Sequence, residues 1–169
     1  MIAASARIAL LLSHAGPAPY SIATFVPEKK GQPGRCAMYT FPNFGDGETV
    51  HQKSVFKADK ADLLWNQIGT AALIFVQSEV DKTGKSYYGE MNLFVMHKDG
   101  KFESRVTLDK EGPIHDIAWM PNGKEFIVIY GFMPATATLF DSKVWMVALG
   151  FVVIARRMIA PLQDPANRA

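Results

Sequence analysis

Residues 112–130 have the sequence GPIHDIAWMPNGKEFIVIY, which predicts two β-strands joined by a tight turn at Pro121-Asn122-Gly123. The stretch has an ungapped counterpart 54 residues earlier. In that alignment Trp65 matches Trp119, Gly69 matches Gly123, and residues 73–76 match residues 127–130. Because a match at a fixed offset is typical of stacked β-units, we expect a repeat architecture.

Short apolar segments separated by turn-forming residues continue this pattern on both sides. Lys98-Asp99-Gly100 is a second strong hairpin signal, and no convincing amphipathic helix precedes residue 144. The sequence therefore predicts an all-β fold. We group the central strands as one blade of residues 50–56, 62–65, 71–77 and 92–97, and the next of residues 102–108, 114–119, 125–130 and 137–140, with part of a third before them.

Four-stranded meanders at this spacing favour a β-propeller over a sandwich. Propellers have typically four to eight blades, and this chain is expected to hold about two and a half WD40-like blades, an incomplete propeller. Trp65 and Trp119 are expected to be structural, as core residues that pack one blade on the next, and Gly123 to serve the turn.

Composition fits one globular domain but gives little direction about partners. The chain has 169 residues, 49% of them hydrophobic and 20% charged, which is enough for a sizeable core. A formal net charge of +2 does not by itself indicate a nucleic-acid partner, so any basic surface must come from local clustering. The single cysteine, Cys36, excludes an internal disulfide and favours a reducing compartment.

Both ends of the chain carry apolar runs. Residues 8–12 follow Arg7, but Pro17 and Pro19 occupy the place where a signal-peptide cleavage site would be wanted. Residues 144–155 form an uncharged run that is shorter than the roughly 20 residues of a membrane-spanning helix. We therefore expect no membrane partner and divide the chain into a partial propeller (1–143) and an atypical apolar and basic tail (144–169). A membrane-tethered or secreted β-domain remains an alternative.

Catalytic motifs are missing from the sequence. The four histidines show no zinc-ligand spacing, and no phosphate-binding loop or nucleophile elbow occurs. We expect no catalytic residue, no cofactor and no metal, and hence no enzyme. His115, next to Asp116, is expected to tie its strand to a turn.

Basic and aromatic residues gather in two of the expected loops. Loops on a rigid β-scaffold are where recognition usually occurs, and lysines beside tyrosines suit RNA phosphates and bases. The candidate RNA or ribosome contacts are Lys29, Lys30, Arg35, Lys82, Lys85, Tyr87 and Tyr88. The alternative is that these are ordinary solvated loops.

A series of short motifs extends over residues 10–143. They include Phe41-Pro-Asn-Phe44, Phe56-Lys-Ala-Asp-Lys60, Leu64-Trp-Asn66, Ser86-Tyr-Tyr-Gly-Glu90 and Tyr130-Gly-Phe-Met-Pro-Ala135. In this order and spacing they resemble the WD-repeat domain of the eukaryotic translation initiation factor 2A family. Residues 144–169 do not resemble it, and the earlier and later blades of that domain are not found in this chain.

The resemblance implies a fold and a function. It implies part of a nine-bladed propeller and a non-enzymatic, cytoplasmic factor that binds the small ribosomal subunit and assists delivery of initiator tRNA. Messenger RNA and other initiation factors are further implied partners. The alternative is a generic propeller scaffold for protein–protein interaction without an RNA role.

Overall fold

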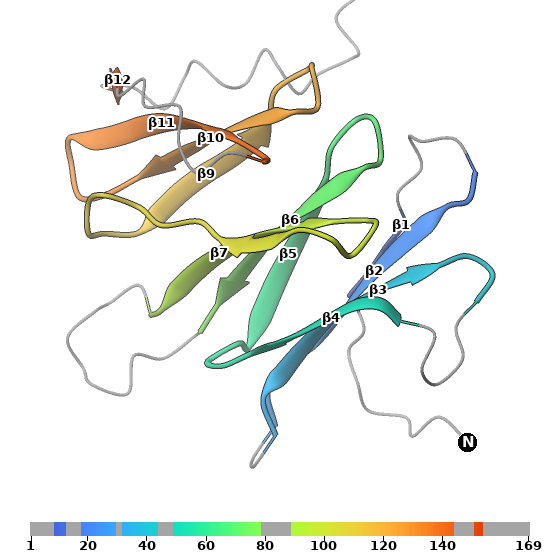
Figure 1. Ribbon diagram of the computed structural model, residues 1–169. Coiled ribbons are helices and arrows are strands. Elements are labelled where there is room, and N and C mark those ends of the chain that lie inside the picture. The colour runs from blue at the N-terminus through green and yellow to red at the C-terminus, as the bar shows by residue number, and fades with distance from the viewer. Residues whose placement is uncertain are drawn as a thin grey trace, which may run out of the picture.

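The computed structural model (Figure 1) describes residues 9–12, 18–29, 32–43, 49–78, 89–143 and 151–153. Within these ranges the chain is all-β, without a helix, and its strands form three four-stranded antiparallel sheets. The sheets lie side by side in chain order, with the second between the first and the third (Figure 1). The predicted all-β, propeller-like fold is thus confirmed.

Each sheet is a meander in which consecutive strands are neighbours. The first sheet contains β1 (Ala9–Leu12), β2 (Ser21–Val26), β3 (Gly34–Thr40) and β4 (Thr49–Val55). The second contains β5 (Lys60–Trp65), β6 (Ala71–Gln77), β7 (Met91–His97) and β8 (Glu103–Arg105). The third contains β9 (Ile114–Trp119), β10 (Glu125–Tyr130), β11 (Ala135–Asp141) and β12 (Phe151–Val153).

The repeat in the sequence corresponds to a structural repeat. β5 and β9 both have six residues and end at the aligned tryptophans, and each pairs with the strand that follows it. Gly69 and Gly123 occupy the turns after them at φ 63° and 66°, a conformation that favours glycine. The hairpin signal at Lys98-Asp99-Gly100 likewise joins β7 to β8, with Gly100 at φ 69°.

The predicted grouping of strands into blades is wrong by one strand. β4 pairs with β3 and completes the first sheet, and β8 pairs with β7 and completes the second. The predicted grouping placed β4 and β5 in one blade, but the short connection between them crosses from the first sheet to the second. There Lys57 adopts φ 55° and Ala58 is fully buried, with its carbonyl accepting a 2.9 Å hydrogen bond from the Glu28 N–H.

The middle sheet is buried on both faces. Along β6, Ala72, Ile74 and Val76 contribute to a core shared with the first sheet, whereas Leu73 and Phe75 contribute to a core shared with the third. Because successive side chains of a strand point to opposite faces, a strand between two cores needs an unbroken apolar run. The sequence AALIFV of residues 71–76 meets that requirement, and all six residues are buried.

One strand lies inside the segment that the sequence analysis separates from the propeller. β12 pairs with β11 through Ala135↔Val153, Thr136↔Val152 and Ala137↔Phe151, so these three residues of the tail extend the third sheet. The other residues of 144–169 lie outside the described residues. The domain boundary at residue 143 therefore stays a prediction.

Candidate functional site

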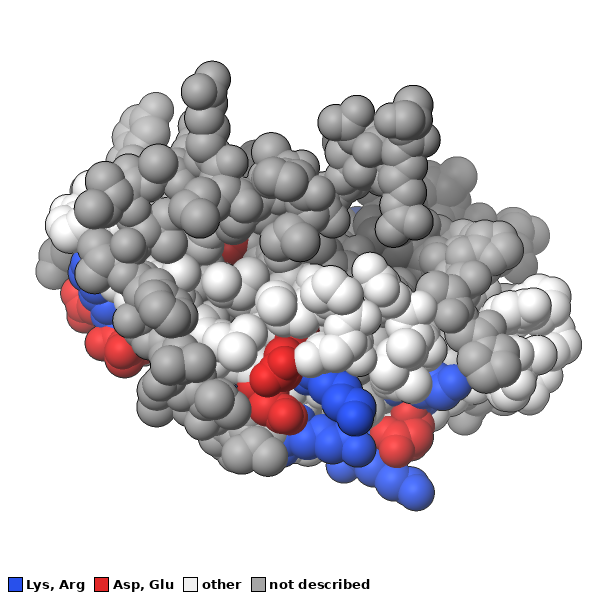
Figure 2. Space-filling model, turned by 90° about the horizontal axis from the view of Figure 1, so that it is seen from above, with Lys and Arg blue, Asp and Glu red and all other residues white. Residues whose placement is uncertain are grey.

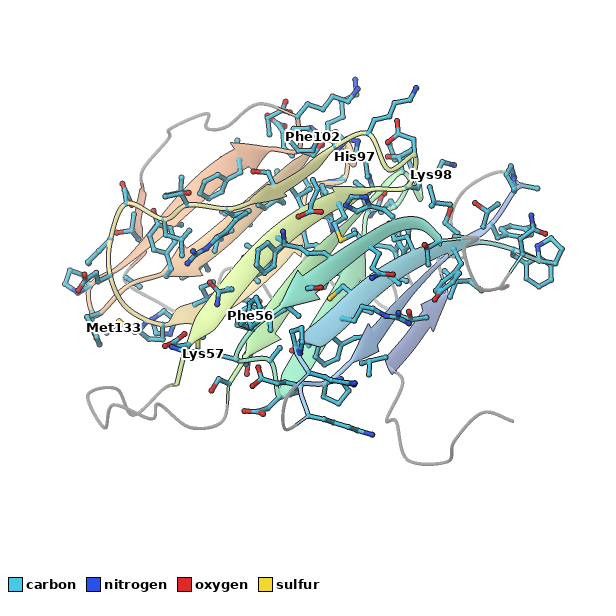
Figure 3. The ribbon with its side chains drawn as sticks, turned by 60° about the horizontal axis from the view of Figure 1, so that its bottom comes forward. Phe56, Lys57, His97, Lys98, Phe102 and Met133 are labelled. Atoms are coloured by element: carbon cyan, nitrogen blue, oxygen red, sulfur yellow. The ribbon has the colours of Figure 1, made fainter. Side chains whose placement is uncertain are left out.

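The sheets present two opposite ends, and the connections that link one sheet to the next share one of them. We call this the Phe56 end. It carries the β2–β3, β4–β5, β8–β9 and β10–β11 connections and both limits of the β6–β7 connection. Backbone hydrogen bonds such as Asp59 N–H to Gln77 O (3.0 Å) and Gly131 N–H to Pro113 O (3.0 Å) join these segments. Figure 3 shows Phe56, Lys57 and Met133 at this end and His97, Lys98 and Phe102 at the other.

Two of the predicted RNA contacts are described, and both lie near the Phe56 end: Lys29 is in the β2–β3 connection, whereas Arg35, expected in the same loop, is the second residue of strand β3. Lys29 and Arg35 are exposed, and Lys29 exchanges two backbone hydrogen bonds with Gln32 (3.1 and 2.8 Å). Lys30, Lys82, Lys85, Tyr87 and Tyr88 lie outside the described residues. The connection that contains the last four starts and finishes at this end, because the Ser78 N–H donates to Glu90 O at 2.9 Å.

Charges at this end are mixed in sign. The Lys57 ammonium is paired with Glu90, and the Lys57 backbone N–H donates to the Glu28 carboxylate at 2.6 Å. Charges of both signs are also neighbours on the face of the molecule seen in Figure 2, where Lys and Arg side chains of the described residues lie beside Asp and Glu side chains. Any recognition of phosphate must therefore rest on particular side chains, and not on the field of a uniformly basic surface.

The β10–β11 turn at the Phe56 end is the part of the site that sequence reasoning missed. Phe132 is 59% exposed and Met133 is 78% exposed. The turn backbone is nevertheless held firmly: Lys110 Nζ donates to the carbonyls of Phe132 (3.0 Å) and Pro134 (2.7 Å). His115 Nε2 donates to Gly131 O at 2.8 Å, so this histidine ties its strand to a turn. An apolar Phe-Met pair between a glycine and a proline was the signal in the sequence.

Trp119 connects the second and third sheets. Its ring meets Phe126 edge to face at 5.4 Å, and its indole N–H donates to Leu64 O at 2.8 Å. Trp65 is half-buried and packs against the core between the first and second sheets. Gly123 lies under Ile68, so close that an added Cβ would stand 2.9 Å from its Cγ1.

Asn66 is a structural residue whose role the sequence did not reveal. Its side chain is fully buried and accepts hydrogen bonds from the Thr70 and Ala71 N–H groups (2.8 and 3.2 Å). Its amide donates to Thr70 Oγ1 (2.9 Å) and, across to the third sheet, to Gly123 O (2.7 Å). One asparagine thus fixes its own turn and the neighbouring sheet together.

A charged cluster joins the edge strands of the first two sheets. Glu103 of β8 is paired with His51 and Lys53 of β4, and the Lys53 ammonium lies 4.8 Å from the centre of the Phe94 ring. Burial alone would raise the pKa of Glu103, but hydrogen bonds from Lys53 and His51 outweigh it and lower that pKa. We assign this cluster to inter-sheet cohesion.

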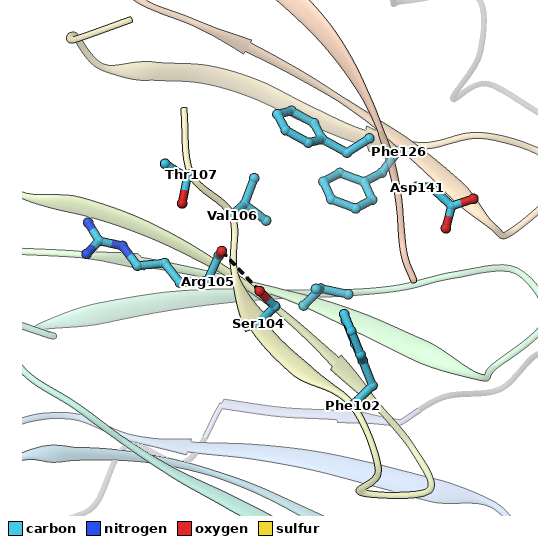
Figure 4. Close-up of a pocket in the computed structure, with 9 residues that line it drawn as sticks. Phe102, Ser104, Arg105, Val106, Thr107, Phe126 and Asp141 are labelled. Carbon is cyan, nitrogen blue, oxygen red and sulfur yellow. Dashed lines mark hydrogen bonds between the residues drawn. The ribbon is translucent and has the colours of Figure 1, made fainter. Parts of the chain in front are cut away.

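The described residues offer little for catalysis. A shallow crevice, partly open to solvent, lies between β8 and the third sheet and is lined by Phe102, Arg105 and Phe126 among others (Figure 4). Burial raises the pKa of the Cys36 thiol to about 12, which disfavours a thiolate nucleophile. The described residues contain neither a group of three or more His, Cys, Asp or Glu that could hold a metal ion nor a helix long and apolar enough to cross a membrane.

Comparisons with known proteins identify the family of this chain. The family model described as "Eukaryotic translation initiation factor eIF2A" matches residues 53–152. The chain belongs to this family. The match reaches past residue 143 and includes part of β12. Trp65, Asn66, Trp119 and the Phe132–Met133 turn all lie within the family match.

Individual relatives agree with the family assignment. Eukaryotic translation initiation factor 2A of Schizosaccharomyces pombe is 46% identical over 130 residues, 77% of this chain and 22% of that protein. The Drosophila melanogaster protein of the same name is 43% identical over 128 residues, 76% of this chain and 20% of that protein. The chain thus spans about a fifth of the length of these relatives.

A solved structure supports the fold. The structure described as "Crystal structure of the eukaryotic initiation factor" aligns with a TM-score of 0.63 and 37% identity. The alignment covers 80% of this chain and 30% of the other. The three sheets therefore correspond to a portion of that larger protein.

Proposed function

We propose that this chain acts in translation initiation without catalysis, by binding the small ribosomal subunit and assisting delivery of initiator tRNA in the cytoplasm. The observation that carries the proposal is membership of the initiation factor 2A family over residues 53–152. The topology adds support, since both loops with the predicted basic and aromatic contacts belong to the Phe56 end. Messenger RNA and other initiation factors are further proposed partners.

Within this proposal, Lys29 and Arg35 contact phosphate, together with the lysines and tyrosines of residues 82–88. Lys29 and Arg35 are exposed at the Phe56 end, where their cationic groups can reach a nucleic-acid backbone. Each phosphate contact releases counterions, so binding must weaken as salt rises. A scaffold that binds only proteins would lack this steep salt dependence.

Sedimentation of the full 169-residue chain with purified small ribosomal subunits tests the proposal. We expect co-sedimentation that declines steeply with salt, and a shallower salt dependence for the Lys29→Ala, Arg35→Ala double variant. Lys124→Ala is the matched control, because Lys124 is exposed in the turn after β9, at the opposite end. Absence of the wild-type chain from the subunit fractions at low salt would refute the proposal.

A further inference from the structure

We propose that the Phe132–Met133 turn is a protein-binding contact, and that its partner is a basic protein surface of the small ribosomal subunit with an apolar recess. This inference rests on the proposed function and deepens it. It assigns to the third sheet a contact with protein that is separate from the RNA contacts proposed for Lys29 and Arg35.

The side chains of the Phe132–Met133 turn are exposed, while its backbone is held rigidly. Met133 and Phe56 are the two most exposed large apolar side chains among the described residues, and Phe132 comes next. Two carbonyls of the turn are bound by Lys110, and a third, that of Gly131, by His115. Gly112 also packs so closely that an added Cβ would stand 2.6 Å from Phe132 N. A turn held in this way loses little conformational freedom when a partner binds its side chains.

Phenylalanine and methionine side chains are well suited to protein interfaces. Aromatic residues and methionine are enriched in the buried centres of protein interfaces, where a few such anchors supply most of the affinity. Methionine is flexible and polarizable, and so adapts to an irregular recess. Adjacent Phe and Met side chains on one protruding turn match that pattern.

The charges next to the turn favour a basic protein surface over RNA as its partner. Exposed Asp109 and Glu111 flank Lys110, whose ammonium donates to two carbonyls of the turn. The side chain of Tyr130 is buried in the third sheet. Its hydroxyl donates a hydrogen bond to Asp109 and so fixes the position of that carboxylate. If bases stacked on Phe132, their phosphates would approach these carboxylates and be repelled by them. Lysines and arginines of a protein partner would instead be attracted to the same carboxylates.

The test compares two probes: purified small ribosomal subunits and the protein-free RNA of the same subunits. The full chain, labelled at its N-terminus, is titrated with each. The Phe132→Ala, Met133→Ala double variant should bind intact subunits at least about tenfold more weakly, as expected for loss of an interface anchor. Its binding to protein-free RNA should be unchanged. Glu111→Lys should also weaken binding to intact subunits, and it should strengthen binding to the RNA.

Phe41→Ala is the matched control, since Phe41 is an exposed aromatic residue (49%) at the opposite end. In thermal melts the double variant should be as stable as the wild type, because the deleted side chains are exposed. Equal affinity of the double variant and wild type for subunits would overturn this inference alone. An equal loss on both probes would also overturn it and assign the turn to RNA. Wild-type chain that binds neither probe would overturn the proposed function as well.

Discussion

At the scale of single residues, Trp119 joins the second sheet to the third. It contributes ring packing against Phe126 and a hydrogen bond from its indole to Leu64 O, although it is only half-buried. We expect Trp119→Ala to lower the free energy of unfolding by about 3 kcal/mol, through the lost apolar contacts and the cavity that remains. Urea unfolding followed by far-UV circular dichroism measures this change.

Trp119→Phe separates the two contributions of that residue. Phenylalanine keeps most of the ring packing but cannot donate to Leu64 O, so the loss should be about 1 kcal/mol. If both variants unfold at the wild-type urea concentration, Trp119 does not hold the two sheets together.

Two substitutions of Asn66 test its accepted and donated hydrogen bonds separately. Asn66→Ala leaves the half-buried Thr70 N–H, the buried Ala71 N–H and the Gly123 carbonyl without this partner, a loss of about 3 kcal/mol. Asn66→Asp keeps the two acceptor contacts but at neutral pH sets a carboxylate oxygen against Gly123 O. Its stability should recover on acidification, because a protonated carboxyl can donate. The urea midpoint of each variant at pH 7 and pH 4 checks this, and equal midpoints for Asn66→Asp at the two pH values would contradict it.

The same two residues show what a sequence can reveal at this scale. Trp119 could be predicted as structural because it repeats at a fixed offset and because large aromatics are mostly buried. The role of Asn66 could not, because Gly123 is 57 residues away and that pairing exists only after two sheets have stacked. The residue that aligns with Asn66 in the repeat is Met120, so the asparagine is not repeated and the repeat does not indicate its contact.

At the scale of elements, the pairing of Glu103 with His51 and Lys53 ties β8 to β4. Because the pKa of Glu103 is lowered on folding, its contribution is present above its unfolded pKa and is lost as pH falls through the folded pKa. We expect Glu103→Gln to be about 1–2 kcal/mol less stable than wild type at pH 7. The difference should shrink as the pH falls below about 4.

Urea midpoints of wild type and Glu103→Gln, measured from pH 7 to pH 3, give that difference directly. The other carboxylates titrate in both proteins, so their effects largely cancel when one curve is subtracted from the other. A difference that stays constant over this range would mean that the ionised form of Glu103 is not what joins the two strands.

The connection between β4 and β5 explains the error in the blade grouping. Most of the described strands and their hairpin turns could be predicted, because alternating apolar residues and Asn-Gly or Asp-Gly turns are local signals. The exception is β12, which lies in the segment assigned to the tail. Which strand closes a sheet depends on whether a short connection reverses within that sheet or crosses to the next. The connection at residues 56–59 crosses because Ala58 is buried between sheets and Lys57 turns with positive φ, and neither feature is marked in the sequence.

At the scale of the whole molecule, the family was easier to recognise from the sequence than the side chains that are candidate contacts. The family could be identified from motifs such as Tyr130-Gly-Phe-Met-Pro-Ala135, which contains the turn between β10 and β11. Lys29 and Arg35 could be chosen by charge alone, because charge is visible in a sequence. The Phe-Met pair of residues 132 and 133 is visible in the sequence, but its exposure is not, because that depends on how Lys110, Gly112 and His115 hold the turn.

The three sheets share two cores through the middle sheet, and this predicts a single unfolding transition. Cys36 of β3 is 1% exposed in the core between the first and second sheets, and its pKa is raised to about 12 by burial. It should resist thiol reagents at pH 8 and react only when that core opens. In urea, the labelling transition of Cys36 should coincide with the loss of far-UV circular dichroism, which reports all three sheets.

Trp119→Ala provides the decisive comparison, because it weakens only the core between the second and third sheets. If the molecule is one cooperative unit, this distant change should move the Cys36 labelling midpoint and the circular-dichroism midpoint together to lower urea. If each sheet unfolds separately, Cys36 labelling should stay at its wild-type midpoint while part of the dichroism is lost earlier. The second outcome would mean that the double-sided burial of β6 does not couple the two cores.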